Sequence, residues 1–83
     1  MEKLNTHKRV AGIKQTRNAI LSGKAESVYV AADAQPFAVA QILELCRDRG
    51  ISPVTEYSAH DIGRACGIDV PCAAAAAVYS AEN

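Results

Sequence analysis

The 83-residue chain lacks large aromatic side chains: it has no tryptophan, one phenylalanine and three tyrosines, although hydrophobic residues make up 49% of it. Its core must therefore be built from alanine, valine, isoleucine and leucine, which suit thin layers packed closely together. It also lacks any apolar run near the roughly 20 residues of a membrane span, and no charged-then-apolar leader opens it. We therefore expect a single soluble, cytoplasmic domain with no membrane partner.

Motifs for metal binding and nucleophilic catalysis are missing as well. Cys46, Cys66 and Cys72 form no C-x-x-C pair, and only His7 and His60 could add ligands to them. Three buried, inert thiols are expected, with no metal and no cofactor. A Cys–His nucleophile would have no orienting third group and no oxyanion site, so we expect no enzymatic activity.

Charge of one sign is not in excess, because nine lysines and arginines balance nine acidic residues. The charges are nevertheless segregated. Residues 1–24 contain six cations and one acid, a balance of +5, whereas residues 25–83 contain three cations and eight acids, a balance of −5. Such segregation creates a local positive field that attracts an anionic partner. A basic N-terminal tail that simply faces water is the alternative interpretation.

Hydrophobic periodicity predicts alternating strands and helices. We expect strands at 10–11, 27–32, 51–57 and 73–79, and helices at 13–22, 37–49 and 59–66. Residues 1–8 are expected to form a loosely ordered basic N-terminal segment. This order predicts an α/β fold over residues 1–83, a three-layer α-β-α sandwich with a four-stranded mixed sheet.

Several residues mark where these elements begin and end. Gly23, Gly50 and Gly67 are expected to close helices, and Pro36 suits the first position of the second helix. Ser58 and Asp61 match a capping box. The run of alanines at 73–79 is ambiguous, because alanine favours helix, whereas a segment that is apolar throughout suits a central strand. We predict a strand there.

The most informative stretch is the start of the first long helix. Gly12 opens it, and its first turn carries Lys14, Gln15, Thr16 and Arg17. A helix start exposes unpaired backbone N–H groups and a partial positive charge, which favour acidic side chains. Cations in this position are unfavourable for the helix itself and therefore indicate an anionic partner.

Three segments resemble signatures of one family. They are GIKQTRN at residues 12–18, VAADAQP at 30–36 and IGRACGIDVP at 62–71. In this order they are similar to the ribosomal protein superfamily of large-subunit protein seven-Ae, whose members bind kink-turn RNA. The similarity covers roughly residues 8–80 and is closest to the short bacterial, ribosomal-protein-like members.

The resemblance implies an α-β-α sandwich that recognises a sharply bent RNA loop, in which tandem sheared G·A pairs follow a bulge. The helix start would enter the widened groove, where Lys14 and Gln15 would read the guanine edges of the G·A pairs. Arg17 and Arg64 would contact phosphates. Asn18 departs from the pattern, because many members have a lysine there.

The same resemblance implies that an apolar loop packs on the flipped-out bulge nucleotide. Asp69 in this loop would accept a hydrogen bond from it. The complete predicted RNA site consists of Gly12, Ile13, Lys14, Gln15, Arg17, Asn18, Arg64, Ile68, Asp69, Val70 and Pro71.

The implied function is that of a monomeric RNA-binding protein that stabilises kink-turns in ribosomal or riboswitch-like RNA. A protein–protein interaction module is the alternative, as in the growth-arrest stress-response branch of the superfamily. Basic and amide groups at the helix start favour RNA.

Overall fold

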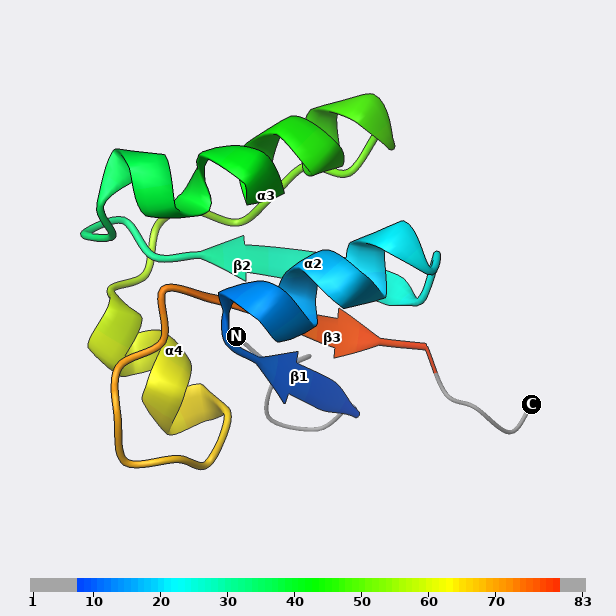
Figure 1. Cartoon of the computed structure of the whole chain (residues 1–83). Coiled ribbons are helices and arrows are strands. Elements are labelled where there is room, and N and C mark those ends of the chain that lie inside the picture. Colours follow the sequence, from blue (N-terminus) through cyan, green and yellow to red (C-terminus); the bar gives the residue numbers. More distant parts are fainter. Residues whose placement is uncertain (1–7, 80–83) are drawn as a thin grey trace.

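Helices and strands alternate along the computed structural model, which describes residues 8–79 (Figure 1). The elements are β1 (Arg9–Ala11), α2 (Ile13–Leu21), β2 (Ala25–Val30), α3 (Pro36–Asp48), α4 (Ala59–Ala65) and β3 (Ala74–Val78). Apart from Lys8, the predicted loosely ordered segment at residues 1–8 lies outside the described residues.

The alanine-rich segment forms the central strand, as predicted. The sheet has the order β1-β3-β2, and β3 runs antiparallel to both neighbours. Ala74, Ala75, Ala76 and Ala77 are completely buried. Because alanine projects only a methyl group, it lets helices approach this strand closely on both faces.

The predicted four-stranded mixed sheet is wrong in one strand. Within residues 51–57 only Val54 pairs with the sheet, through an isolated parallel bridge to Tyr29. The N–H of Val30 donates to the carbonyl of Val54, which lies 24 residues further along the chain. The N–H of Ala32, however, donates to the carbonyl of Tyr57, so that donor and acceptor are now 25 residues apart. This slip of one residue interrupts the ladder before a fourth strand can form.

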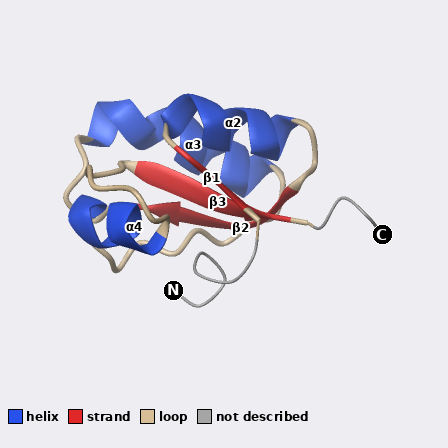
Figure 2. Ribbon diagram, turned by 90° about the horizontal axis from the view of Figure 1, so that it is seen from below, coloured by secondary structure: helices blue, strands red, loops and turns tan. Residues whose placement is uncertain are grey.

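Helices cover both faces of the sheet, which gives the predicted three layers (Figure 2). Helices α2 and α3 pack on one face, where Val28 and Val30 of β2 join their buried side chains. Helix α4 packs on the other face, against Tyr29 of the same strand and Ala31, which follows the strand. Successive strand residues point to opposite faces, so β2 contributes to both halves of the core.

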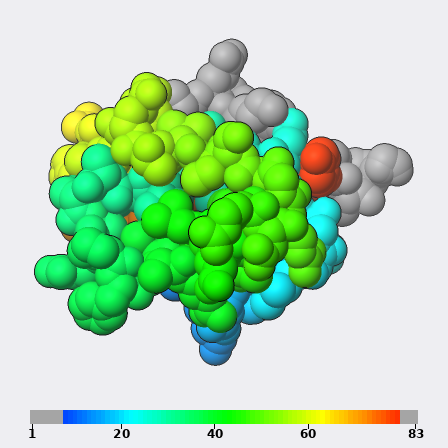
Figure 3. Space-filling view, turned by 90° about the horizontal axis from the view of Figure 1, so that it is seen from above, coloured from blue at the N-terminus to red at the C-terminus, as the bar shows by residue number. Residues whose placement is uncertain are grey.

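Most of the predicted helix ends are correct. Pro36 occupies the first turn of α3, and the hydroxyl of Ser58 accepts a hydrogen bond of 3.1 Å from the N–H of Asp61. Gly23, Gly50 and Gly67 follow the three helices with positive φ. Helix α3 forms the middle of the surface seen in Figure 3. None of the helices described in residues 8–79 is long and apolar enough to cross a membrane.

Candidate nucleic-acid interface

The register of the sheet brings three connecting segments to one edge. Ala11 at the end of β1 pairs with Ala75, and Val30 at the end of β2 pairs with Ala74. The segments that follow β1 and β2 therefore meet the segment that precedes β3 (Figure 1). We call this region the loop edge. It comprises residues 12–18, 31–37 and 67–73.

The start of α2 is shaped by Gly12. This residue has φ 111° and ψ 157°, a conformation that is open to glycine and strained for other residues. Its N–H donates to the carbonyl of Ala74 at 2.8 Å, which ties the helix start to β3. A Cβ atom at Gly12 would lie 2.5 Å from Oε1 of Gln15. Glycine is therefore needed for the Gln15 side chain to lie against the first turn.

Three polar side chains of α2 face the solvent: Lys14, Gln15 and Asn18 are exposed, and Arg17 is half-buried. The first turn contains no acidic residue, and no side chain caps the helix. The N–H groups and partial positive charge of this helix end therefore act together with the side-chain donors of Lys14 and Gln15. The arrangement suits a partner rich in hydrogen-bond acceptors and negative charge.

Two residues of the same helical turn point inward instead. Thr16 is completely buried, and its Oγ1 has no hydrogen-bond partner within the described part of the chain. Ile13 is half-buried and packs against the core between α2 and α3. The sequence alone suggests that the hydroxyl of Thr16 belongs to the polar first turn. In the structure this hydroxyl is buried and does not contribute to the exposed surface.

The third segment of the loop edge, residues 67–73, follows α4 and packs against that helix. The N–H of Ile68 donates to the carbonyl of Gly63 at 3.1 Å, and that of Cys72 to the carbonyl of Ala59 at 2.9 Å. A Cβ atom on Gly63 would overlap the carbonyl oxygen of Val70. The loop can therefore approach this closely only because residue 63 is glycine.

The outer side of this loop is exposed and largely apolar. Val70 is 59% exposed and Ile68 is 38% exposed, and Asp69 and Pro71 also face the solvent. Arg64 is exposed in the last turn of α4, just before the loop. The predicted cation Arg64 and the apolar side chains of the loop are thus all exposed at the C-terminal end of α4.

Arg9 links β1 to the C-terminal end of α4. Its Nε donates to the carbonyl of Cys66 at 3.0 Å, at the C-terminal end of α4. Its Nη2 lies 3.1 Å from the position that a Cβ on Gly67 would take. A cation at a helix C-terminus is favourable, because the carbonyl groups there carry partial negative charge. The guanidinium therefore has a structural role between β1 and α4.

One exposed aromatic side chain at the loop edge was not predicted from the sequence. Phe37 is 82% exposed in the first turn of α3, next to the exposed Gln35. The buried stripe of this helix consists of Val39, Ile42 and Cys46, and Phe37 falls outside it. An isolated phenylalanine off the stripe is the signal that could have drawn attention to this position.

The three cysteines lie in the interior of the fold. All are buried and free, and burial raises the pKa of the Cys46, Cys66 and Cys72 thiols above the ordinary value. Within residues 8–79, no group of three or more histidine, cysteine or acidic side chains is placed to hold a metal ion.

We expect slow alkylation of these thiols by iodoacetamide at neutral pH. The thiolate is the reactive form, and a raised pKa lowers its fraction at every pH below that pKa. The rate should therefore lie below that of free cysteine and increase on unfolding in urea. Mass spectrometry of labelled peptides measures this, and one thiol that reacts faster than free cysteine in the folded protein would contradict it.

The chain matches known proteins over nearly its whole length. The model of the ribosomal protein L7Ae/L30e/S12e/Gadd45 family matches residues 1–83. An RNA-binding protein of Caldanaerobacter subterraneus subsp. tengcongensis is 46% identical over 71 residues, which cover 86% of this chain and 87% of that protein. The large ribosomal subunit protein eL8 of Halobacterium salinarum is 36% identical over 72 residues, and the match covers 86% of this chain and 60% of that protein.

A solved structure shows the same architecture. The 15.5kD RNA binding protein of Giardia lamblia superposes with a TM-score of 0.83 at 30% sequence identity, over 96% of this chain and 68% of that one. These names are those of RNA-binding and ribosomal proteins. The chain belongs to the ribosomal protein L7Ae/L30e/S12e/Gadd45 family.

Proposed function

We propose that this protein binds structured RNA and recognises kink-turns through the loop edge. The observation that carries the proposal is the start of α2, where Lys14 and Gln15 are exposed in a first turn without an acidic residue. The names of the bacterial relative and of the Giardia structure, both RNA-binding proteins, support an RNA partner.

In this proposal the α2 start reads the G·A pairs. Lysine donates to the O6 and N7 acceptors of guanine, and the amide of Gln15 provides both a donor and an acceptor. Gly12 lets the backbone and the Gln15 side chain approach the RNA, and Ile13 supports the turn from the core side. Asn18 follows one turn later and reaches the RNA with a neutral amide.

The loop at residues 67–71 receives the unpaired nucleotide of the bulge. A flipped-out base offers a flat apolar face, which suits the exposed side chains of Ile68, Val70 and Pro71. Asp69 accepts a hydrogen bond from this nucleotide, and Arg64 contacts a phosphate. Because the loop is already fixed on α4, little conformational entropy is lost on binding.

The proposed partner is a kink-turn in ribosomal or riboswitch-like RNA, bound by a monomer in the cytoplasm. The eL8 relatives carry the name of a ribosomal protein, which supports association with the ribosome. The proposed role is binding and stabilisation of bent RNA, without catalysis.

Arg17→Ala tests the phosphate contacts. Removing one cation from the interface should weaken binding about equally for kink-turns of different sequence and reduce the slope of log Kd against log salt by about 1. Arg47→Ala removes an exposed cation from α3 and should change neither quantity. An Arg17→Ala protein with an unchanged salt slope would exclude this contact.

Fluorescence transfer between labels on the two RNA arms tests the proposed function. Addition of the protein should increase the transfer for a kink-turn, because binding stabilises the bent form. An RNA of equal length whose G·A pairs are replaced by Watson–Crick pairs should show no increase. Equal changes for both RNAs would contradict kink-turn recognition, and binding of neither would favour a protein-interaction module.

A further inference from the structure

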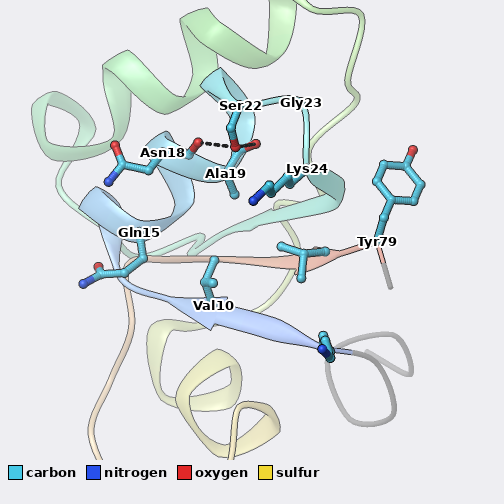
Figure 4. Close-up of a pocket in the computed structure, with 10 residues that line it drawn as sticks. Val10, Gln15, Asn18, Ala19, Ser22, Gly23, Lys24 and Tyr79 are labelled. Carbon is cyan, nitrogen blue, oxygen red and sulfur yellow. Dashed lines mark hydrogen bonds between the residues drawn. The ribbon is translucent and has the colours of Figure 1, made fainter. Parts of the chain in front are cut away.

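A groove of about 560 Å³ lies beside α2 and runs from Gln15 toward Lys24 (Figure 4). Val10 and Val78 contribute apolar side chains from the sheet, and Asn18 of α2 and Ser22, which follows the helix, line the other side. Gln15 lies at one end, whereas Lys24 and Tyr79 lie at the other (Figure 4). Gln15 and Asn18 therefore belong both to the loop edge and to the groove.

The far end of the groove combines two cations with an aromatic ring. The N–H of Val78 donates to the carbonyl of Lys8 at 2.8 Å, and the N–H of Tyr79 donates to the carbonyl of Lys24 at 3.0 Å. Because β3 lies between β1 and β2, these bonds place the two lysines on opposite sides of its end. The Tyr79 side chain is 57% exposed at this end of the groove.

This combination is chemically matched to a nucleotide. Two ammonium groups attract a phosphate, and an exposed aromatic ring provides a stacking surface for a base. The amides of Gln15 and Asn18 can donate to and accept from base edges. None of the described residues that line the groove is acidic. An acidic peptide would satisfy the lysines but would leave the stacking surface unused.

We infer that the groove holds an unpaired nucleotide that flanks the bent RNA, with its base on Tyr79 and its phosphate between Lys8 and Lys24. This inference rests on the proposed function, because one RNA would then occupy the loop edge and the groove together. The protein would favour kink-turns that continue into a single strand over kink-turns that end in closed duplexes.

Titration with extended RNAs tests the inference. The set contains a blunt-ended kink-turn and a series of derivatives. Each derivative carries about three unpaired nucleotides on a different strand end, so that the series samples every strand end. At least one derivative should bind the full chain roughly fivefold tighter than the blunt RNA, since stacking on an aromatic side chain contributes about 1–3 kcal/mol per base.

Substitutions in the groove make the test specific. Tyr79→Ala should abolish the gain from the extension, whereas Tyr79→Phe should preserve it, because the ring stacks without its hydroxyl. Lys24→Ala should reduce the gain, and the matched cation control Arg47→Ala should not. All four variants should bind the blunt kink-turn with unchanged affinity.

The possible failures are distinguishable. If the blunt kink-turn binds and no extension improves its affinity, the groove inference is wrong and the proposed function stands. The inference is equally wrong if an extension improves binding and Tyr79→Ala leaves the gain intact. Absence of binding by every RNA overturns both the inference and the proposed function.

Discussion

Gln15→Ala is expected to remove about 1–3 kcal/mol of discrimination between a kink-turn and the same RNA without G·A pairs, or roughly 5- to 150-fold. The side chain is exposed at the α2 start, where it lies against Gly12. An amide presents a donor and an acceptor to a base edge, and alanine presents neither. The ratio of the two dissociation constants, measured by fluorescence anisotropy, checks the result.

Gln41→Ala is the matched control, because it removes an exposed amide from α3. It should leave the ratio unchanged. The effect of Gln15→Ala should lie in specificity, so affinity for the RNA without G·A pairs should stay nearly constant. If Gln15→Ala weakens binding to both RNAs equally, Gln15 does not read the G·A pairs.

Gly63→Ala is expected to destabilise the protein, although helix propensity alone predicts the opposite. Replacing glycine by alanine inside a helix ordinarily stabilises by roughly 0.5–1 kcal/mol. Here the new methyl group would overlap the backbone carbonyl of Val70, which belongs to the loop packed on α4. Overpacking of this kind typically costs about 1–3 kcal/mol, and a backbone atom cannot move away as easily as the end of a side chain.

The net result should be a lower free energy of unfolding and a melting temperature reduced by on the order of 10 °C in thermal denaturation. Gly50→Ala is an informative comparison, because Gly50 has φ 72° and open space around its Cβ position. The change in the free energy of unfolding of Gly50→Ala should therefore reflect backbone strain alone, without a steric clash. A Gly63→Ala protein that is more stable than the parent would refute the tight packing of the loop on α4.

Gly63→Ala also tests whether RNA binding depends on the position of the loop at residues 67–71, and not only on its side chains. At a temperature where the variant remains folded, a displaced loop should weaken kink-turn binding, even though Ile68, Val70 and Pro71 are all retained. Gly50 lies beyond the end of α3, so Gly50→Ala should leave RNA affinity unchanged in the folded protein.

Sequence patterns predicted the parts of the fold that depend on burial of neighbouring residues. Every residue of the run Ala74–Val78 is apolar, and as a central strand between two helical layers it buries its four alanines completely. The start of α2 was predicted from Gly12 and the cations that follow it. Both features depend on short stretches of chain, which explains why they could be recognised without the structure.

The features that were missed depend on contacts between distant segments. Nothing within residues 51–57 reveals that the hydrogen bonds to β2 slip by one residue after Val54. Likewise, the role of Arg9 follows only from its contact with the end of α4. Gly63 appears in the sequence as a poor helix former, and its purpose becomes visible only against the carbonyl of Val70.

We propose above all that the start of α2 distinguishes a kink-turn from ordinary duplex RNA. The most direct measurement is the ratio of dissociation constants for a kink-turn and for the same RNA with Watson–Crick pairs in place of the G·A pairs. We expect nanomolar binding to the kink-turn and much weaker binding to the duplex, with the difference reduced by Gln15→Ala. Equal affinity for the two RNAs would contradict it.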